Sequence, residues 1–225
     1  MFKNLFLHNW FAILYFNFKM LPFKKAIFIP FDFYGSVRFI SLKGKVCLDT
    51  NRIRPGMIKL GSQGRDMFPL NPVVLDIRGI LRFKGSFKLG CGSTIRVEPN
   101  AELCMGVNSR VGANCLVFCE DKIQIGDNVG MSWYSQIMDT DTHSVINVKT
   151  TEIGKRKSPV VIGANTWIGN HVIINKGCVL PRGTIVASMS LCNKNYMELI
   201  PDYSLIGGVP AKLLKTDVKR GDDKL

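Results

Sequence analysis

The sequence predicts an all-β solenoid of parallel strands, wound as a triangular prism, and two observations predict it. Aliphatic residues recur every six positions, and small or β-branched residues recur four places after each of them. An amphipathic helix would repeat every 3.6 residues and an ordinary strand every two, so a period of six fits neither. Six residues instead suit one short strand on each side of a prism, with about 18 residues in a coil.

The period is clearest over residues 162–192. Every sixth residue there is apolar, namely Ile162, Ile168, Ile174, Leu180, Val186 and Cys192. The residues four places later are Thr166, Val172, Cys178, Thr184 and Ser190. The same step joins Val111, Val117 and Ile123, and then Ile125, Met131 and Ile137. Between residues 42 and 88 the pattern is irregular, with Val46, Ile58, Val73, Val74 and Ile80 as its apolar marks. We therefore expect a solenoid domain of roughly eight coils over residues 42–195, with irregular early coils.

One interruption separates two well-patterned stretches of the repeat. The hexad phase is lost between Ile137 and Val160, where the chain is polar and charged. A solenoid expels such an insertion as a loop, and loops on a rigid scaffold commonly carry functional residues. We expect this loop, residues 138–159, to carry the active site.

Composition limits the classes of partner. The 225 residues include 30 Lys and Arg against 17 Asp and Glu, a formal net charge of +13, which favours anionic partners. No recognised nucleic-acid motif accompanies this charge, so we expect no nucleic-acid partner. Seven cysteines and three histidines argue against a disulfide framework or a zinc ribbon and favour a reducing, cytoplasmic compartment.

The two ends of the chain differ from the repeat. Residues 1–41 are rich in aromatic residues with interspersed lysines, and their longest apolar run, Trp10 to Phe16, is too short to span a bilayer. We favour a helical cap that covers the open end of the solenoid, because such an end needs covering. The alternative is an aromatic, basic segment that lies on an anionic membrane surface, at its inner face. Residues 196–225 are expected to form a short C-terminal tail.

Four motifs follow one another in a characteristic order. They are DTDTH at residues 139–143, PVVIG at 159–163, WIG at 167–169 and GVPAK at 208–212. In this order they resemble the hexapeptide-repeat acyltransferases, which have the left-handed parallel β-helix fold, and within them the branch that O-acetylates sugars and surface polysaccharides. The resemblance implies acetyl-CoA as the acyl donor, no metal, and a homotrimer with its active sites between adjacent prisms. The stretch VASMS at residues 186–190 departs from the Ile-Gly-Ala-Gly-Ser that the family often has there.

The predicted chemistry needs a base, because a sugar hydroxyl is a poor nucleophile toward a thioester. His143 is the only histidine of the polar loop, and we assign it as the general base of a direct transfer without an acyl-enzyme. Asp139 and Asp141 precede it by four and two positions. One carboxylate is expected to hold the imidazole tautomer and the other to bind acceptor hydroxyls, and the sequence leaves open which does which.

The resemblance also implies where the cofactor binds. Trp167 would line the thioester end of the cofactor channel, with Asn170 and Ser188 beside the pantetheine arm. Near the adenine and the 3′-phosphate would lie Asn193, Lys194 and Lys212. Ser132 and Trp133 lie one coil before the loop and are expected to flank the sugar or glycan acceptor. His171 takes an outward-facing position, as a surface or subunit-contact residue.

Three alternatives remain open at this point. Within the transferases, the chain fits a sugar N-acyltransferase or a serine acetyltransferase. A γ-type carbonic anhydrase shares the fold but needs three histidine ligands for zinc, and only His143 and His171 lie in or beside the repeat. A non-catalytic solenoid scaffold would bind partners without any turnover of acetyl-CoA.

Overall fold

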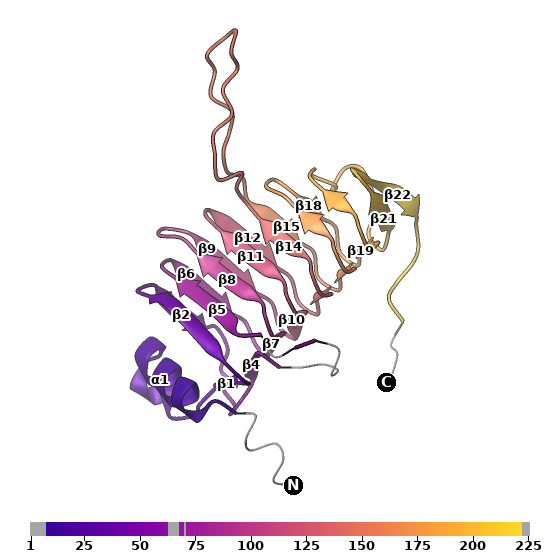
Figure 1. Ribbon diagram of the computed structural model, residues 1–225. Helices are drawn as coiled ribbons and strands as arrows, with labels where there is room; N and C mark the ends of the chain where they lie inside the picture. The colour runs from indigo at the N-terminus through magenta and orange to yellow at the C-terminus, as the bar shows by residue number, and fades with distance from the viewer. Residues whose placement is uncertain (1–7, 63–67, 70, 222–225) are drawn as a thin grey trace.

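The computed structural model describes residues 8–62, 68, 69 and 71–221, and most of them wind into a stack of coils (Figure 1). Three parallel sheets form the sides of a triangular prism, as the six-residue period predicts. A helical segment covers the N-terminal end of the stack, and a strand pair closes the other end. The all-β solenoid with a helical cap is therefore confirmed.

Among the described residues, the three sheets hold nine, seven and six strands. Sheet I consists of β1 (Phe31–Phe33), β4 (Ile58–Leu60), β7 (Phe87–Leu89), β10 (Ser109–Val111), β13 (Gly130–Met131), β16 (Trp167–Ile168), β19 (Ile185–Val186), β21 (Leu205–Gly208) and β22 (Ala211–Lys215). Sheet II consists of β2 (Val37–Leu42), β5 (Val73–Ile77), β8 (Thr94–Val97), β11 (Leu116–Cys119), β14 (Gln136–Met138), β17 (Ile173–Ile174) and β20 (Leu191–Cys192). Sheet III consists of β3 (Lys45–Leu48), β6 (Ile80–Phe83), β9 (Glu102–Met105), β12 (Lys122–Ile125), β15 (Val160–Ile162) and β18 (Val179–Leu180).

The interior of the prism is filled by the residues that define the period. The six apolar positions from Ile162 to Cys192 are at most 1% exposed, and the five small positions that follow them are at most 2% exposed. Each coil therefore contributes the same kind of side chain at the same height on each face. Register also resumes after the interruption, because Ile123 and Ile125 of β12 pair with Val160 and Ile162 of β15.

The corners of the prism are made by left-handed turn residues. At the corner between sheets III and I, Asn108, Asn128 and Asn165 have φ values of 55°, 55° and 61°. Their amides form a ladder, because Asn108 Nδ2 donates to Asn128 Oδ1 and Asn128 Nδ2 donates to Asn165 Oδ1, both at 3.1 Å. Asparagine tolerates this backbone region better than most residues, so it recurs where the chain turns.

The early coils differ from the expected pattern in two respects. Strand β5 buries Val73, Leu75 and Ile77 and leaves Val74 half-buried, while Ile80 of β6 is also half-buried. These longer strands bury two or three residues each. The period of one buried aliphatic residue in six is therefore weak in this part of the sequence. The first coil also begins at β1, before the expected boundary at residue 42, because β1 pairs with β4 and β2 pairs with β5.

The N-terminal cap consists of α1 (Trp10–Met20) and α2 (Phe23–Ala26). Phe16 is fully buried, with its ring centroid 4.9 Å from that of Phe31 and 5.3 Å from that of Phe33. Buried Asn17 ties α1 to the first strand, since its amide donates to the Phe31 carbonyl at 2.9 Å and accepts from the Phe31 N–H at 3.1 Å. The helical cap is thus built onto the end of the prism by both apolar packing and hydrogen bonds.

The other face of the cap is open to solvent. Its exposed large apolar residues are Trp10, Phe11, Leu14, Tyr15, Phe18, Phe23, Ile27 and Phe28, and we call them the cap face. Lys19 and Lys24 are exposed beside them, and Asp32 is the first acidic residue of the chain. Within the described ranges, no helix is long and apolar enough to cross a membrane.

The C-terminal tail extends sheet I instead of leaving the prism. Strand β21 pairs in parallel with β19, and β22 returns antiparallel to β21. The chain then passes back toward sheet I, where the Val218 N–H donates to the Tyr203 carbonyl at 2.8 Å. The tail therefore both closes the stack and reaches the outer surface of an earlier part of it.

Candidate active site

The interrupting loop is a long hairpin that leaves the prism at the corner between sheets II and III (Figure 1). We call residues 139–159, between β14 and β15, the flap. Antiparallel bridges join Thr140 to Lys157 and Ile146 to Ile153 across it. Residues 141–155 are all exposed, and Val148 is 92% exposed. The loop predicted at residues 138–159 is thus a protruding two-stranded arm.

Asp139 anchors the flap to the prism. Its side chain is completely buried, and its carboxylate accepts the backbone N–H groups of Glu120 at 2.7 Å and Asp121 at 2.8 Å. The Cys119 thiol donates to the same carboxylate at 3.5 Å. Burial, together with this negative charge, raises the pKa of the Cys119 thiol well above its usual range, so the thiol keeps the proton that it donates.

Ion pairs fix the base of the flap above Asp139. Thr140 Oγ1 donates to the Glu120 carboxylate at 2.6 Å, and Arg156 pairs with the same carboxylate from the opposite strand of the flap. Asp141 pairs with Lys176, which lies on the turn after β17. Both strands of the flap are therefore held at the corner, and the residues that follow Asp141 start from a fixed position.

His143 lies just beyond this fixed base, and its side chain is exposed. Within the described residues, no hydrogen bond or ion pair joins its ring to either candidate carboxylate. Asp139 bonds backbone N–H groups and Asp141 pairs with Lys176, so each carboxylate has another partner in the single chain. The three predicted catalytic residues thus share one segment, but the single chain does not build a hydrogen-bonded carboxylate–imidazole pair.

A second group of predicted residues gathers at the corner between sheets I and II. Trp167 points outward from β16, 37% exposed, and its indole Nε1 donates to Ser132 Oγ at 3.3 Å. One coil further, the Ser188 hydroxyl donates to the Asn170 side-chain carbonyl, and the Met189 N–H donates to the Asn170 backbone carbonyl at 3.0 Å. The predicted acceptor and pantetheine residues therefore do lie on neighbouring coils.

This corner also carries an aromatic cluster that the sequence did not reveal. Tyr134 stacks on His171, with ring centroids 5.1 Å apart and planes 9° apart. Phe68 lies 5.8 Å from Trp133 and 5.6 Å from Tyr134 between ring centroids. Tyr134 and His171 occupy the same left-handed turn position, with φ of 57° and 55°. A tyrosine gives no local signal for such a backbone position, so its outward placement could not be anticipated.

The tail adds another residue that sequence reasoning missed. The Arg220 guanidinium lies over the Trp167 ring, 5.5 Å from its centroid. Residues 167 and 220 are brought together only because the tail turns back after β22. The cation gives the outer face of Trp167 a positive partner.

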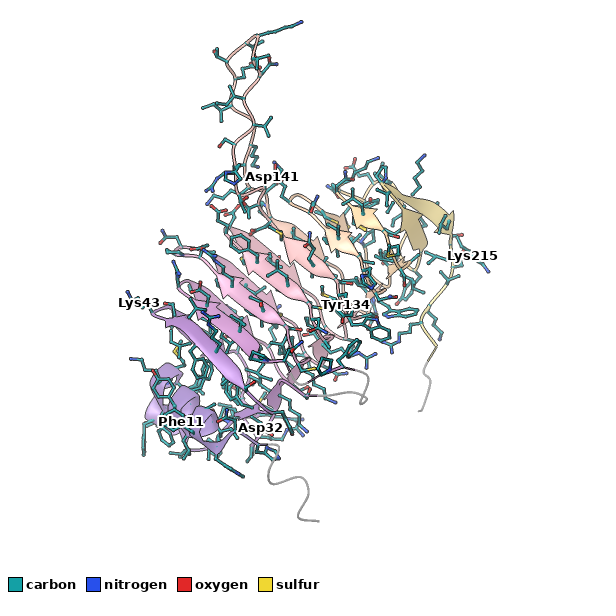
Figure 2. All side chains as sticks on the ribbon, viewed as in Figure 1. Phe11, Asp32, Lys43, Tyr134, Asp141 and Lys215 are labelled. Carbon is teal, nitrogen blue, oxygen red and sulfur yellow. The ribbon has the colours of Figure 1, made fainter. Side chains whose placement is uncertain are left out.

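The two groups of predicted residues lie at different corners of the chain. His143, Asn193 and Lys194 lie on turns between sheets II and III, whereas Trp167, Asn170 and Ser188 lie on the far side of sheet II. Figure 2 shows Asp141 and Tyr134 at opposite edges of the stack. At the rise of a strand, the four to five residues between these corners span roughly 13–17 Å. Lys212 is on β22 of sheet I. A single chain therefore presents the two halves of the predicted site without joining them.

The described residues offer no set of side chains that could bind a metal ion. These residues contain no group of three or more His, Cys, Asp or Glu side chains placed to hold a metal ion. His143 and His171 belong to different corners of the prism.

Comparison with known proteins finds acetyltransferases among the sequence relatives and the structural neighbours of this chain. No protein-family model matches the chain. It is 34% identical over 129 residues to a probable acetyltransferase of Mycobacterium tuberculosis, across 56% of this chain and 41% of that protein. It is 28% identical over 131 residues to the galactoside O-acetyltransferase of Escherichia coli, across 55% of this chain and 62% of that protein. The alignments thus span about half the length of these curated relatives.

A solved structure settles the fold. The polySia-specific acetyltransferase NeuO superposes with a TM-score of 0.53 at 19% identity, over 87% of this chain and 90% of that chain. This likeness identifies the prism as the left-handed parallel β-helix. The chain resembles the hexapeptide-repeat acetyltransferases in sequence and in fold. The relatives are acetyltransferases, in agreement with the enzyme class that the motifs predict.

The buried carboxylate predicts a stability effect at the flap base. Asp139→Ala leaves two partly buried N–H groups without their acceptor, and we expect the free energy of unfolding to fall by about 2–4 kcal/mol in urea denaturation. Asp141→Ala removes one exposed ion pair, and the expected loss is about 1 kcal/mol or less. Equal losses in the two variants would show that Asp139 does not anchor the flap.

Proposed function

We propose that the protein transfers an acetyl group from acetyl-CoA to a hydroxyl group of a sugar or surface-polysaccharide precursor. One observation carries the proposal. The chain presents a histidine-bearing flap at one corner of the prism and presents Trp167, Asn170 and Ser188 at the next corner. The galactoside O-acetyltransferase relative and the polySia-specific neighbour support an oxygen acceptor on a glycan.

In the proposed reaction, His143 takes the proton of the acceptor hydroxyl as its oxygen attacks the thioester carbonyl. A C–O bond forms, the C–S bond of the thioester breaks, and the imidazolium returns the proton to the departing sulfur. Transfer is direct and forms no acyl-enzyme. Asp141 is the nearer carboxylate in sequence and is exposed, so it is the better placed of the two to meet the imidazole or an acceptor hydroxyl. Asp139 acts in this proposal as a positioning residue, through the flap base that it holds.

The donor would bind along the stack at the corner between sheets I and II. Trp167 borders the thioester, while Asn170 and Ser188, about 4.8 Å apart along the stack, border the pantetheine arm. Asn193 and Lys194 of a neighbouring chain, with Lys212, would meet the adenine and the 3′-phosphate. The predicted donor residues are divided between the corner that carries His143 and the corner beside Trp167, so one arrangement of two chains would bring the two groups together.

We infer a homotrimer from the family resemblance together with this division. A contact between two different corners of identical chains is heterologous, and such contacts form a ring when the rotation between neighbouring chains closes. The flap exposes Val145, Ile146, Val148 and Ile153, an apolar surface on an arm that reaches beyond the prism. A neighbouring prism would cover these side chains and receive His143 beside its Trp167.

The proposed base makes a direct prediction for turnover. His143→Ala should slow the release of CoA thiol from acetyl-CoA by about 10²–10⁴-fold, the usual contribution of a general base. The measurement is thiol release against a panel of nucleotide sugars and glycans. His171→Ala is the matched comparison, because His171 is the other histidine of the repeat and stacks on Tyr134. We expect less than about a tenfold effect there, since proton transfer is not lost.

Near-full activity of the His143→Ala variant would eliminate the mechanism. Absence of turnover by the wild-type protein with every acceptor would instead favour a non-catalytic scaffold. A comparable loss in both histidine variants would mean that the effect comes from the assembly and not from a base.

We further propose that the cap face contacts an anionic membrane surface, which places the protein at the inner face of the cytoplasmic membrane. Exposed aromatic rings suit the boundary between headgroups and acyl chains. Lys19 and Lys24 flank these rings, and the absence of any acidic residue before Asp32 leaves nothing to repel anionic lipid. In a trimer, three cap faces would point toward the same surface.

Vesicle binding tests the membrane contact. Wild-type protein should co-sediment with phosphatidylglycerol-rich vesicles and not with phosphatidylcholine vesicles. Phe11→Ser with Phe23→Ser should reduce this binding at least about tenfold, because each ring would bury a large apolar area in the membrane interface and the substitutions remove both rings. Leu213→Ser with Leu214→Ser removes exposed apolar side chains at the other end of the stack and should change little. Equal effects of the two double variants would contradict the proposal.

A further inference from the structure

A hollow of about 860 Å³ lies over the outer surface of sheet I, away from the flap. Six cationic residues line it, namely Arg54, Lys59, Lys88, Arg110, Lys219 and Arg220, and we call it the basic groove. No acidic side chain is part of its lining within the described residues. Early coils and the C-terminal tail supply the charged residues of the lining, and corner residues of later coils, among them Gly183 and Tyr203, continue it along the stack.

Three of these cations stand in one row across neighbouring strands. Lys59 of β4 pairs in register with Lys88 of β7, and Lys88 pairs with Arg110 of β10. The next two positions in the row are Gly130 and Trp167. At about 4.8 Å per strand, the row leads from Lys59 to Trp167 over about 19 Å. It therefore points along the stack directly at the predicted thioester position.

The cations of the groove form no ion pairs among the described residues, unlike several arginines elsewhere on the prism. Arg78, Arg82, Arg96 and Arg156 each form an ion pair with a carboxylate. None of the six groove cations forms one within the described ranges. Like charges directly opposite each other on a sheet destabilise it, and an anion bound over Lys88 and Arg110 would offset this repulsion.

Gly130 allows two of the guanidinium groups to lie close together. A Cβ at this position would stand 3.0 Å from Arg220 Nη1 and 3.2 Å from Arg110 Nε. Burial and the charge of Arg220 lower the pKa of Arg110 below its usual value. At the other end, Asp32 pairs in register with Lys59, and its carboxylate bonds His8 Nδ1 at 2.7 Å. The row of cations therefore begins beside the acidic residue Asp32. It ends beside Trp167, where the Arg110 and Arg220 guanidinium groups lie close together.

We propose that the basic groove binds an anionic glycan chain, carrying carboxylate or phosphate groups, and leads it to Trp167 as the acceptor. This inference rests on the proposed acetyl transfer and specifies its substrate class. The donor does not account for the groove, because Asn170 and Ser188 follow β16 and β19, whereas Lys59, Lys88 and Arg110 lie on coils before β16. Donor and acceptor would approach Trp167 from opposite directions along the stack.

Glycan binding in the absence of the donor tests the groove. The probes are an oligogalacturonate, a phosphorylated mannan oligosaccharide, a neutral dextran and single-stranded DNA, each measured by calorimetry at about 0.1 M salt. Lys59→Gln with Lys88→Gln should weaken binding of a charged glycan about tenfold, through the loss of two charge contacts. Arg38→Gln with Lys43→Gln removes the same charge from sheet II and its following turn, and should change this affinity less than about twofold. The preferred charged glycan identifies the anionic group.

Three outcomes would overturn the groove proposal. They are equal binding of dextran and the charged glycans, equal weakening in the two double variants, and DNA binding as tight as that of the preferred glycan. Turnover separates this proposal from the proposed function. If the Lys59→Gln, Lys88→Gln double variant keeps wild-type turnover on a small neutral sugar, acetyl transfer stands and only the groove is under test. If the wild-type protein binds charged glycans in the groove but releases no thiol with any acceptor, the failure lies in the proposed activity.

Discussion

The narrow interior of the prism is the constraint on which the rest of the structure depends. In the later coils, each face admits one aliphatic side chain, followed by a small one where the corner closes, as Ile168 and Val172 do. Because the side chains inside are so closely matched there, each coil pairs in register with the coil before it. An outward residue then has a fixed height on the stack and a fixed side of the prism. The scaffold therefore sets the distances between functional side chains on its surface.

The flap shows how such a scaffold tolerates a long insertion. Strand β15 resumes on β12 as if nothing had intervened, with Ile162 opposite Ile125. The buried carboxylate of Asp139 then holds the point of departure, by bonding the N–H groups of the preceding turn. An acidic residue in this place looks catalytic in the sequence because it lies near His143. Its burial and its two backbone partners indicate instead that it supports the arm on which His143 is carried.

The sequence predicts those parts of the molecule that follow from local spacing. The period located the core from Val111 to Cys192, and the loss of phase located the flap. The six-residue period is less informative in β5, where several inward-facing residues share one strand. Contacts between distant segments were beyond it, because Lys59, Lys88 and Arg110 become one row only through the pairing of β4, β7 and β10. Tyr134 and Arg220 were missed for related reasons: one depends on a left-handed turn, and the other on the path of the tail.

The division of the site between two corners is the central claim, and mixed assemblies test it most directly. Chains with His143→Ala can be produced together with chains with Ser188→Trp, in which the indole fills the expected path of pantetheine. The flap and the cofactor channel of one site would come from different chains. When the two variants mix randomly in equal amounts, about a quarter of all sites then have both an intact flap and an intact channel. Turnover should then rise to about a quarter of the wild-type value, far above either variant alone. Mixed assemblies no more active than the separate variants would contradict the account, because each chain would then have to supply both parts of its own site.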